Sequence, residues 1–446
     1  MPAKFGTDGI RGKANIDVTP NIAYKIGLAV SHSLSGGKKI LIGRDPRISG
    51  TMLENAIASG ICAGGSDAHI AGIVPTPAVA FLVLSEGFDA GIMISASHNP
   101  YYDNGIKIFS SDGMKLSDEI ERKVENDISN ADAIPLACDD KIGTVSHRPD
   151  LLRKYESHVS SIKLNGDFAN IKRKVLIDCA NGSASVTAES IFVSDEFFQF
   201  DTINDKPNGV NINLNCGSTK LGTLAEYVQS GGYDLGIAFD GDADRCLAVD
   251  EFGREIDGDR IITALAKEFK SRGTLTEDLV VVTKLSNIGL HMYLNSNGIG
   301  VLETDIGDRF VLERMVETGA ILGGEQSGHI IVSTYATTGD GQVTAKLMLS
   351  LLKLNSGTAS KVFGGMTVYP QIAVSVKIPN EDKNKAAEKL DKSREAHVIR
   401  DKLLGKGRLL IRASGTEPKV RIMLEGEDAE ELKAYADELV QLTTNS

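Results

Sequence analysis

The chain has 446 residues, of which 41% are hydrophobic and 24% are charged, and its formal net charge is −12. At roughly 100–200 residues per domain, this length is too great for one hydrophobic core and predicts about three or four domains. The negative charge argues against a nucleic acid or an anionic membrane as a partner, because either would be repelled. A small anionic substrate is compatible, since arginines and lysines in individual loops can form a local positive pocket.

The sequence also predicts a soluble, cytoplasmic protein. Its five cysteines are scattered without a C-x-x-C spacing, which favours neither a disulfide framework nor a zinc site and fits a reducing compartment. The first residues contain no apolar signal region. The longest apolar stretch, residues 70–84, is broken by two prolines and is too short to cross a bilayer.

Paired apolar runs recur along the chain and predict three similar α/β units. The first run of each pair, followed by a segment of helical character, lies at residues 39–45, 174–182 and 279–287. The second run lies at residues 89–95, 234–240 and 320–325. Continuous apolar runs that alternate with helices are typical of buried strands in a largely parallel sheet. Because ligands bind at the carboxyl ends of such strands, the loops after the second runs are candidate sites.

The candidate loop of the first unit reads S-A-S-H-N-P at residues 95–100, with a lysine at position 107. Small residues, a hydroxyl and a proline predict a tight turn that projects one side chain into a cleft. Ser97 is a candidate nucleophile, although it lacks the G-x-S-x-G elbow of acyl-transfer enzymes. Taken alone, Ser97 and His98 are typical of ordinary turn residues, and Lys107 of a surface lysine that can reach a phosphate.

Three carboxylates at alternate positions, Asp240, Asp242 and Asp244, follow the second run of the second unit. On an extended backbone alternate side chains point to one side, so the three carboxylates are expected to converge. Converging anions need a cation, and hard oxygen ligands favour Mg²⁺ or Ca²⁺. An EF-hand does not fit, because its sixth loop position requires glycine and is Arg245 here, and because residues 246–250 are typical of a strand. A solvated acidic turn is the alternative interpretation.

The third unit contains a glycine-rich loop, G-G-E-Q-S-G-H at residues 323–329. Glycines let the backbone approach a ligand, and Glu325 and Ser327 can bind sugar hydroxyls. His329 is equally compatible with a core histidine. Upstream, G-D-R at residues 307–309 is either a further polar turn of the site or the start of a helix.

The last part of the chain has a different pattern. Runs of alternating apolar and polar residues, typical of half-exposed antiparallel strands, lie at 371–378, 408–412 and 420–425. Helices are expected at about 381–403 and 428–443. Asp428 and Glu431 form a plausible N-terminal cap pair for the second helix. We therefore expect a small α+β domain after a linker at residues 364–370.

The loop between the last two of these strands is a candidate phosphate clamp. Two arginines, two hydroxyls and a glycine can hold a phosphate through charge-assisted and backbone hydrogen bonds. The residues concerned are Arg412, Ser414, Gly415, Thr416 and Arg421. An exposed hairpin turn is the alternative interpretation.

These loops fall in four expected domains. The nucleophile loop, the metal loop, the sugar-binding loop and the phosphate clamp are expected in residues 1–155, 156–255, 256–366 and 367–446, respectively. The expected fold is three similar α/β domains with largely parallel mixed sheets and a small C-terminal α+β domain, arranged around a central cleft. Together the four loops indicate phosphoryl transfer on a phosphorylated sugar.

The same motifs carry a resemblance to the α-D-phosphohexomutases that extends nearly from end to end. It rests on F-G-T-D-G-I-R-G at 5–12, S-A-S-H-N-P at 95–100, D-G-D-A-D-R at 240–245, G-E-Q-S-G-H at 324–329 and R-A-S-G-T-E-P at 412–418. The first motif and the loop around Gln326 resemble the bacterial branch that acts on glucosamine phosphates. Phosphomannomutases and phosphoglucomutases tend to carry methionine or another residue at that position.

The resemblance implies a role for each candidate residue. Ser97 would carry the transferred phosphoryl group and would bind the metal ion together with Asp240, Asp242 and Asp244. Catalytic roles are implied for Ser97, Lys107, Arg245 and His329, and the proton-transfer group is left open among the last three. Substrate binding is implied for Arg11, Glu325, Ser327, Arg412, Ser414, Gly415, Thr416 and Arg421.

By the same resemblance, the chain would interconvert glucosamine 6-phosphate and glucosamine 1-phosphate through a phosphoserine enzyme and a 1,6-bisphosphate. Mg²⁺ would be the cofactor, and glucosamine 1,6-bisphosphate or glucose 1,6-bisphosphate the activator. The protein would be a monomer or a homodimer, and a mobile C-terminal domain would help the intermediate to turn.

Three alternatives differ in what they require of these residues. A mutase for neutral hexose phosphates would share the whole site, because an amine and a hydroxyl at C2 are nearly isosteric. A phosphatase with Asp240 as its nucleophile would not need Ser97. A sugar-phosphate sensor would be expected to lack the nucleophile or a metal ligand, and neither is missing here.

Overall fold

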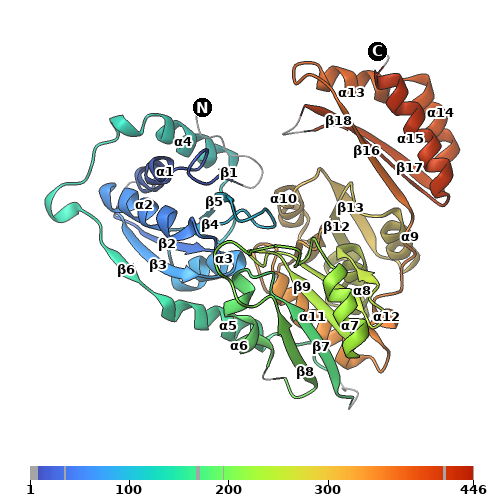
Figure 1. The fold of residues 1–446 in the computed structure, drawn as a ribbon, viewed down its shortest axis with the longest axis horizontal. Helices are drawn as coiled ribbons and strands as arrows, with labels where there is room; N and C mark the ends of the chain where they lie inside the picture. The colour runs from blue at the N-terminus through green and yellow to red at the C-terminus, as the bar shows by residue number, and fades with distance from the viewer. Residues whose placement is uncertain (1–8, 35–36, 167–170, 194, 415–417, 445–446) are drawn as a thin grey trace. The chain divides into compact units, whose positions relative to one another are not determined.

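The computed structural model describes residues 9–34, 37–166, 171–193, 195–414 and 418–444. The chain divides into two compact units, each described here by itself. The larger unit comprises Met1–Lys284 with Ile299–Gly365, and the smaller comprises Leu285–Gly298 with Met366–Ser446. The larger unit contains three mixed sheets and the smaller unit a fourth, antiparallel sheet (Figure 1).

The first sheet has the strand order β1-β5-β4-β2-β3-β6. Its strands are β1 (Ile10–Lys13), β2 (Lys39–Arg44), β3 (Asp67–Ile73), β4 (Ala90–Ile94), β5 (Asp103–Ser110) and β6 (Val145–His147). Its helices are α1 (Pro20–Ser33), α2 (Gly50–Ala63), α3 (Thr76–Glu86) and α4 (Asp118–Ser129). Strands β2, β3, β4 and β6 are parallel where they pair, whereas β5 is antiparallel to both neighbours.

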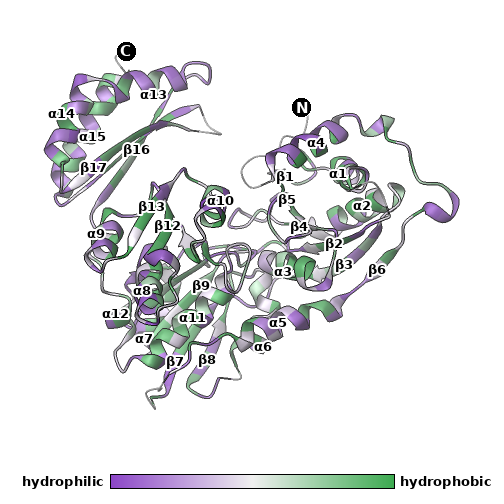
Figure 2. Ribbon diagram, turned by 180° about the vertical axis from the view of Figure 1, so that it is seen from behind, coloured by the Kyte–Doolittle hydropathy of each residue, from purple (hydrophilic) through white to green (hydrophobic). Residues whose placement is uncertain are grey.

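Both faces of this sheet are covered, which explains its continuous apolar strands. Ile40 and Ile42 of β2 belong to a core shared with α1, α2 and α4, and the intervening Leu41 is fully buried on the opposite face. A side chain at Gly91 on that face would collide with Val79 and Val83 of α3. Figure 2 accordingly shows α3 as largely apolar and α4 as largely polar.

The second and third sheets have the orders β11-β10-β9-β7-β8 and β13-β12-β14-β15. Their strands are β7 (Arg173–Asp178), β8 (Phe198–Ile203), β9 (Leu235–Phe239), β10 (Cys246–Asp250), β11 (Glu255–Ile256), β12 (Leu279–Thr283), β13 (Gly300–Thr304), β14 (Leu322–Gly324) and β15 (Ile330–Val332). The accompanying helices are α5 (Leu152–Ser161), α6 (Ala188–Phe192), α7 (Gly222–Gly231), α8 (Gly258–Ser271), α10 (Asp308–Thr318), α11 (Gly341–Leu354) and α12 (Ala359–Val362).

The three sheets share one pattern, as the paired apolar runs predicted. In each sheet the strand of the first run, β2, β7 or β12, lies between two parallel neighbours. The strand of the second run, β4, β9 or β14, is followed along the chain by an antiparallel partner, β5, β10 or β15. The predicted α/β fold class is therefore confirmed, and the candidate loop of each α/β unit directly follows its second-run strand.

The smaller unit contains the predicted α+β arrangement. The antiparallel sheet has the order β16-β18-β17, with strands β16 (Gln371–Lys377), β17 (Gly407–Ala413) and β18 (Lys419–Gly426). The helix expected at 381–403 is in fact two helices, α13 (Lys383–Asp391) and α14 (Arg394–Leu403). The second begins where the Ser393 hydroxyl accepts a hydrogen bond from Ala396 N at 3.1 Å, which is an N-terminal cap.

The last helix, α15 (Ala429–Thr444), begins at the predicted cap residue. Asp428 Oδ1 accepts hydrogen bonds from Glu430 N at 2.9 Å and Glu431 N at 3.1 Å. The Glu431 side chain contacts Tyr435 and Lys406. The carboxylate of Asp428 therefore caps the helix, while the Glu431 side chain points to partners along and beside it.

Helix α9 (Ile288–Ser296) belongs to the smaller unit although β12 and β13, which flank it in sequence, belong to the larger one. The fully buried Glu425 of β18 accepts hydrogen bonds from Ile288 N at 2.9 Å and from Arg408 Nε at 2.7 Å. Asn287 exchanges two hydrogen bonds with the Tyr369 backbone, at 2.9 and 3.0 Å. These buried polar contacts anchor α9 to the C-terminal sheet.

Within the described ranges, no helix combines the length and the apolar character needed to cross a bilayer.

Candidate active site

Ser97 lies in a tight turn immediately after β4, and its side chain points at the metal loop. Its φ angle is +52°, in the left-handed region that non-glycine residues rarely adopt. The residue is 1% exposed. Its hydroxyl donates a hydrogen bond to Asp240 Oδ2 at 2.5 Å, across 143 residues of sequence. The turn therefore aims a buried hydroxyl at the carboxylate cluster.

The carboxylates of Asp240, Asp242 and Asp244 converge, as predicted, with one oxygen from each within 4.8 Å of the others. The reason differs from the one expected. Residues 240–245 form a turn between β9 and β10 in which Ala243 has a φ of +56°. The turn itself, and not an alternating extended strand, brings the three side chains together. Strand β10 follows at once, as expected from the sequence.

Lys107 from β5 places its ammonium group among the carboxylates. Its Nζ lies 2.8 Å from Asp242 Oδ2 and 3.0 Å from Asp244 Oδ2, and its side chain is 3% exposed. Thr76, the first residue of α3, donates its hydroxyl hydrogen to Asp242 Oδ2 at 2.6 Å. Lys107 is thus a buried charge partner of the cluster and not the surface lysine that its position in the sequence also allowed.

The carboxylates differ in how tightly they hold a proton. Burial, with the negative charges of Asp244 and Asp242, raises the pKa of Asp240 well above its ordinary value. Burial also acts to raise the pKa of Asp244, but the positive charges of Lys107 and His329 outweigh it and bring this pKa well below the ordinary range. Of these two carboxyls, Asp240, beside the Ser97 hydroxyl, therefore holds a proton more readily, while Asp244 stays ionised next to its cationic neighbours.

The donor set suits a magnesium ion. Two buried oxygens, Asp242 Oδ1 and Asp244 Oδ1, have no hydrogen-bond partner among the described residues. A buried carboxylate oxygen without a partner is unfavourable unless a cation binds it. Three carboxylates and the oxygen on Ser97 offer only hard oxygen ligands. Mg²⁺ prefers such ligands, whereas softer metals prefer nitrogen or sulfur.

A small polar cavity of about 190 Å³ opens beside the metal loop. Besides the metal-loop residue Asp244, it brings together four further predicted site residues from distant parts of the sequence: Arg11, Arg245, Glu325 and His329. Asp244 and Asp308 also line it. Ser327 lies next to this group, with its Oγ 3.4 Å from Glu325 Oε2. A cavity with two guanidinium groups and several carboxylates can bind a ligand that carries both a phosphate and hydroxyl or amino groups.

Asp308 both begins α10 and contributes to this cavity, so the two interpretations of residues 307–309 are both correct. Its carboxylate is held by Lys115 Nζ at 2.6 and 2.8 Å. His329 Nε2 lies 3.3 Å from Asp308 Oδ2 and also accepts the Gly339 N–H at 3.1 Å. The Gly339 contact suits a neutral imidazole and the Asp308 contact a protonated one, so both protonation states of His329 have a partner.

The two histidines of the site have opposite electrostatic environments. Burial acts to lower the pKa of His329, but the carboxylates of Asp308 and Asp244 outweigh it and the pKa is raised. For His98, burial and the nearby Arg245 and Arg11 lower the pKa to about 4. His98 is therefore neutral at physiological pH, and its Nδ1 lies 3.3 Å from Ser97 Oγ.

Gln326, which the sequence favoured as a mark of the glucosamine branch, contacts protein. Its Nε2 donates to Asp257 Oδ2 at 3.3 Å, and Asp257 caps the N-terminus of α8. Its side chain therefore helps to fix the position of the loop that carries Glu325 and Ser327.

The phosphate-clamp residues lie in the smaller unit. Arg412 of β17 and Arg421 of β18 are direct cross-strand partners. Burial, with the charge of Arg421, lowers the pKa of Arg412. The backbone N–H of Ser414 donates to Lys419 O at 2.9 Å and closes the base of the loop. Gly415 and Thr416 lie outside the described residues. Two like charges placed opposite each other favour a bound anion at this edge of the sheet.

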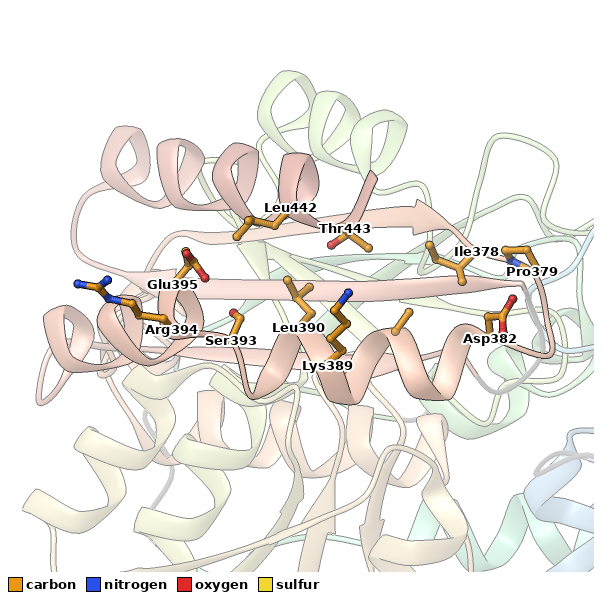
Figure 3. A pocket seen from close by; sticks show the side chains of 11 residues that line it. Ile378, Pro379, Asp382, Lys389, Leu390, Ser393, Arg394, Glu395, Leu442 and Thr443 are labelled. Carbon is orange, nitrogen blue, oxygen red and sulfur yellow. The ribbon is translucent and has the colours of Figure 1, made fainter. Parts of the chain in front are cut away.

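A larger cavity of about 570 Å³ lies in the smaller unit, between α13, α14 and the end of α15 (Figure 3). Apolar and polar or charged residues both line it: Ile378, Pro379, Asp382, Ala386, Lys389, Leu390, Ser393, Arg394, Glu395, Leu442 and Thr443. None of these residues is a predicted site residue. The small polar cavity beside the metal loop is therefore the better candidate for the reaction.

The sequence did not reveal several residues that position this site. Asp45 and Arg47 form a fully buried pair whose hydrogen bonds support the Ser97 turn. Thr76 and Asn213 contact the metal loop and the Ser97 loop, respectively. Only Asp45 and Arg47 carried a signal, because they follow the first-run strand β2 at the same sheet edge as Ser97.

The sequence matches one family over four successive regions. The matches are to the phosphoglucomutase/phosphomannomutase alpha/beta/alpha domains I, II and III, at residues 2–134, 153–253 and 257–369, and to the C-terminal domain at 374–442. The chain belongs to this family, within the α-D-phosphohexomutase superfamily. The predicted boundaries at 155, 255 and 366 lie near the junctions of these matches and stay predictions.

Individual proteins similar to this chain include one curated relative and two solved structures. The phosphoglucosamine mutase of Caldicellulosiruptor saccharolyticus is 47% identical over 447 residues, covering 99% of each chain. A phosphoglucomutase/phosphomannomutase family protein from Burkholderia thailandensis has a similar structure, with a TM-score of 0.83 at 23% identity over 100% of this chain and 98% of that one. The Aspergillus fumigatus N-acetylphosphoglucosamine mutase, in complex with GlcNAc-6P and magnesium, has a TM-score of 0.66 at 18% identity, covering 98% and 95%.

Proposed function

We propose that this protein interconverts glucosamine 6-phosphate and glucosamine 1-phosphate through a phosphoserine enzyme and a 1,6-bisphosphate intermediate. It is then an isomerase that works by phosphoryl transfer. The observation that supports this most is the buried Ser97 hydroxyl, 2.5 Å from Asp240 in a cluster of three carboxylates. The full-length similarity to phosphoglucosamine mutases supports the choice of sugar.

The reaction has two half-reactions that mirror each other. In the first, O1 of glucosamine 6-phosphate attacks the phosphorus on Ser97, the P–Oγ bond breaks, and a 1,6-bisphosphate forms. The bisphosphate turns over within the site. In the second, Ser97 Oγ attacks the phosphorus on O6, the P–O6 bond breaks, and glucosamine 1-phosphate leaves. The enzyme is phosphorylated again, so atoms and charge balance over the cycle.

Charged side chains around Ser97 stabilise the transferring phosphoryl group. Lys107 and Arg245 supply positive charge next to Asp244, one of the three carboxylates of the cluster. Asp240, Asp242 and Asp244 would hold Mg²⁺, which neutralises negative charge on the phosphoryl oxygens when bound. Ser97 Oγ is the one protein atom that bonds covalently to the phosphoryl group in this proposal, and the other side chains contribute through positioning and charge.

We assign proton transfer to His329. Arginine cannot lose its proton in a protein, and Lys107 is held as an ammonium between two carboxylates. His329 lines the cavity, and the neighbouring Gly339 N–H and Asp308 carboxylate suit its neutral and protonated forms. It can therefore take the proton of the attacking O1 hydroxyl in the first half-reaction and give a proton to O6 when the P–O6 bond breaks in the second.

The remaining predicted residues complete the proposal. Glu325 and Ser327 bind sugar hydroxyls, and Arg11 binds a phosphate from within the small cavity. The non-reacting phosphate is bound by Arg412, Ser414, Gly415, Thr416 and Arg421. Glucosamine 1,6-bisphosphate or glucose 1,6-bisphosphate activates the enzyme by phosphorylating Ser97. The protein is cytoplasmic and is a monomer or a homodimer.

A ³¹P NMR time course tests the proposal. The enzyme, Mg²⁺ and a trace of the matching 1,6-bisphosphate are incubated separately with glucosamine, glucose and mannose 6-phosphate at equal concentration. Fastest formation of the 1-phosphate from the glucosamine substrate supports the proposal. Faster conversion of glucose or mannose 6-phosphate would support a mutase but would show that its preferred substrate is not glucosamine 6-phosphate.

Variants of two serines separate the mutase from a phosphatase. Ser97→Ala should abolish formation of the 1-phosphate, whereas Ser59→Ala, on the exposed face of α2, should not change it. Release of inorganic phosphate that persists in Ser97→Ala would identify Asp240 as the nucleophile of a phosphatase. This result would overturn the proposal that the protein is a mutase.

A further inference from the structure

The carbonyl oxygen of Ser97 is held from two sides by side chains that come from different parts of the chain. Arg47 Nη2 donates to it at 2.8 Å and Asn213 Nδ2 at 2.9 Å. The same Asn213 nitrogen also donates to Asn99 O at 3.1 Å, so both of its hydrogens point to the Ser97 loop. A carbonyl that accepts two hydrogen bonds is fixed in direction, and this one belongs to the residue that we propose to be phosphorylated.

Such fixing is needed because Ser97 has an unfavourable backbone conformation. A left-handed φ in a non-glycine residue costs roughly 1 kcal/mol or more and persists only where the surroundings impose it. Relaxation of this φ by rotation about the N–Cα bond would turn the Ser97 side chain and its carbonyl together, away from their present positions. The two donors to the carbonyl oppose that rotation.

Asn213 is itself anchored and closely packed. It lies in the segment between β8 and α7, and its backbone N–H donates to Ala180 O at 2.8 Å. A Cβ atom built at Gly241 would lie 2.6 Å from Ser97 O and 2.8 Å from Asn213 Nδ2. The glycine of the D-G-D-A-D motif is therefore required because the Asn213 amide passes over it to reach the Ser97 carbonyl.

We propose that Asn213 is a positioning residue for phosphoryl transfer, which fixes the Ser97 loop against the metal loop through the Ser97 carbonyl. The inference rests on the proposed function. Asn213 donates to backbone oxygens and not to Ser97 Oγ, and it is absent from the described residues that line the small cavity. It acts through Ser97, and a displacement of about 1 Å at a reacting group is enough to lower a rate about 100-fold.

Two substitutions test the inference. Asn213→Gly removes the amide without strain, because Asn213 has a φ of +57° that glycine adopts readily. Asn213→Asp keeps the shape and replaces both donor hydrogens by an acceptor that repels the carbonyls. The matched control is Asn215→Gly, since Asn215 has a φ of +54° and lies exposed in the same segment.

Steady-state kinetics with glucosamine 6-phosphate give the first readout. We expect kcat to fall at least tenfold in Asn213→Gly and further in Asn213→Asp, with KM within twofold of the unsubstituted enzyme and no change in Asn215→Gly. Retained kcat in Asn213→Gly would overturn the inference, as would a rise in KM alone, which would place Asn213 in contact with substrate. A fall in kcat that matches the loss of folded protein by circular dichroism would also overturn it.

The ³¹P resonance of the phosphorylated enzyme gives a readout that a purely structural role would not move. We expect the phosphoserine signal to shift or broaden in both Asn213 variants and to stay unchanged in Asn215→Gly. If the unsubstituted enzyme shows no mutase activity and no phosphoserine signal, the proposed function itself fails. If both are present and the Asn213 variants match the control, only the inference fails.

Discussion

Arg47 and Asp45 form an ion pair in which neither side chain is exposed to solvent, with Arg47 Nε 2.9 Å from Asp45 Oδ2. The pair holds the Ser97 turn in place through hydrogen bonds. Arg47 also donates to backbone oxygens of Ser97 and Asp103, at 2.8 and 3.1 Å. Asp45 accepts the Ser95 hydroxyl at 2.7 Å, and Ser95 Oγ in turn accepts Ser97 N–H at 2.8 Å. Removing one partner would leave a buried charge without compensation.

Asp45→Ala should therefore destabilise the protein by about 3–5 kcal/mol, the usual effect of breaking a buried pair. The matched control is Asp150→Ala, which removes an acidic partner of Arg148 at the surface. That pair is exposed, so its loss should leave the unfolding midpoint unchanged. Urea unfolding followed by circular dichroism measures both. Equal midpoints for the two variants would contradict the structural role given to Asp45.

Thr76 should tune metal affinity without binding the metal. Its hydroxyl orients Asp242 through a hydrogen bond of 2.6 Å, and loss of such a supporting contact typically lowers metal affinity about 10–100-fold. We expect Thr76→Val to raise the Mg²⁺ concentration for half-maximal activity by that factor, and Thr76→Ser to restore it. Magnesium titrations of activity after dialysis against EDTA measure the effect. An unchanged requirement in Thr76→Val would show that Asp242 needs no such support.

Stability should fall as pH rises from about 4 to about 6 because of Asp340. Burial raises the pKa of this N-cap carboxyl of α11 to about 6, against 3.8 for an ordinary aspartate. The folded state therefore binds the proton more tightly than the unfolded state over this interval. As the pH rises and the folded state loses this proton, the free energy of unfolding falls. The loss of stability due to Asp340 reaches about 3 kcal/mol once the group is ionised in both the folded and the unfolded state.

Asp340→Asn removes this titration while keeping an acceptor for the helix N-terminus. Differential scanning calorimetry at pH 4 and pH 6.5 should show that the unsubstituted protein loses stability relative to the variant as the pH rises. Parallel pH profiles would mean that Asp340 is already ionised in the folded state at pH 4.

Substitution of Arg412 should separate stability from anion binding. Removing one of two like charges that face each other across β17 and β18 relieves repulsion, so Arg412→Gln should leave the melting temperature unchanged or slightly raised. The KM for glucosamine 6-phosphate should rise at least tenfold if the pair binds its phosphate. Lys377→Gln is the control: it also removes one of two facing like charges, since Lys377 pairs with Lys419, so it should have the same small effect on the melting temperature and leave KM unchanged. A KM equal to that of the control would remove Arg412 from the site.

The sequence predicted the parts of the fold that follow from local pattern. Buried strands such as β4 and β9 have five consecutive buried residues, and a run of that kind is visible in the chain. The polar loops that follow them were found for the same reason, and with them Ser97 and Asp240. Local pattern also placed the strands of the C-terminal sheet.

The sequence could not show contacts that depend on tertiary packing. Arg47, Thr76 and Asn213 reach their partners across 50, 166 and 116 residues. Each is an ordinary polar residue in its own segment, and only Arg47, which follows β2 at the sheet edge that also carries Ser97, gives a sign of where its partner lies. The break between α13 and α14 was missed for a different reason, since it depends on a single serine cap without a proline or a glycine.

Helix α9 also limits how the C-terminal domain can be exchanged between relatives. A recombination event that replaced residues 366–446 as one continuous cassette would bring in a foreign β18 while leaving α9 in place. The incoming chain would need its own equivalent of the Glu425 carboxylate to receive Ile288 N–H, and a backbone placed like that of Tyr369 to pair with Asn287. Without them, a buried helix end would face an unmatched sheet. Exchange of this domain is thus constrained by a ten-residue stretch about 70 positions upstream of it, and chimaeras should fold only when the incoming segment provides matching partners for α9.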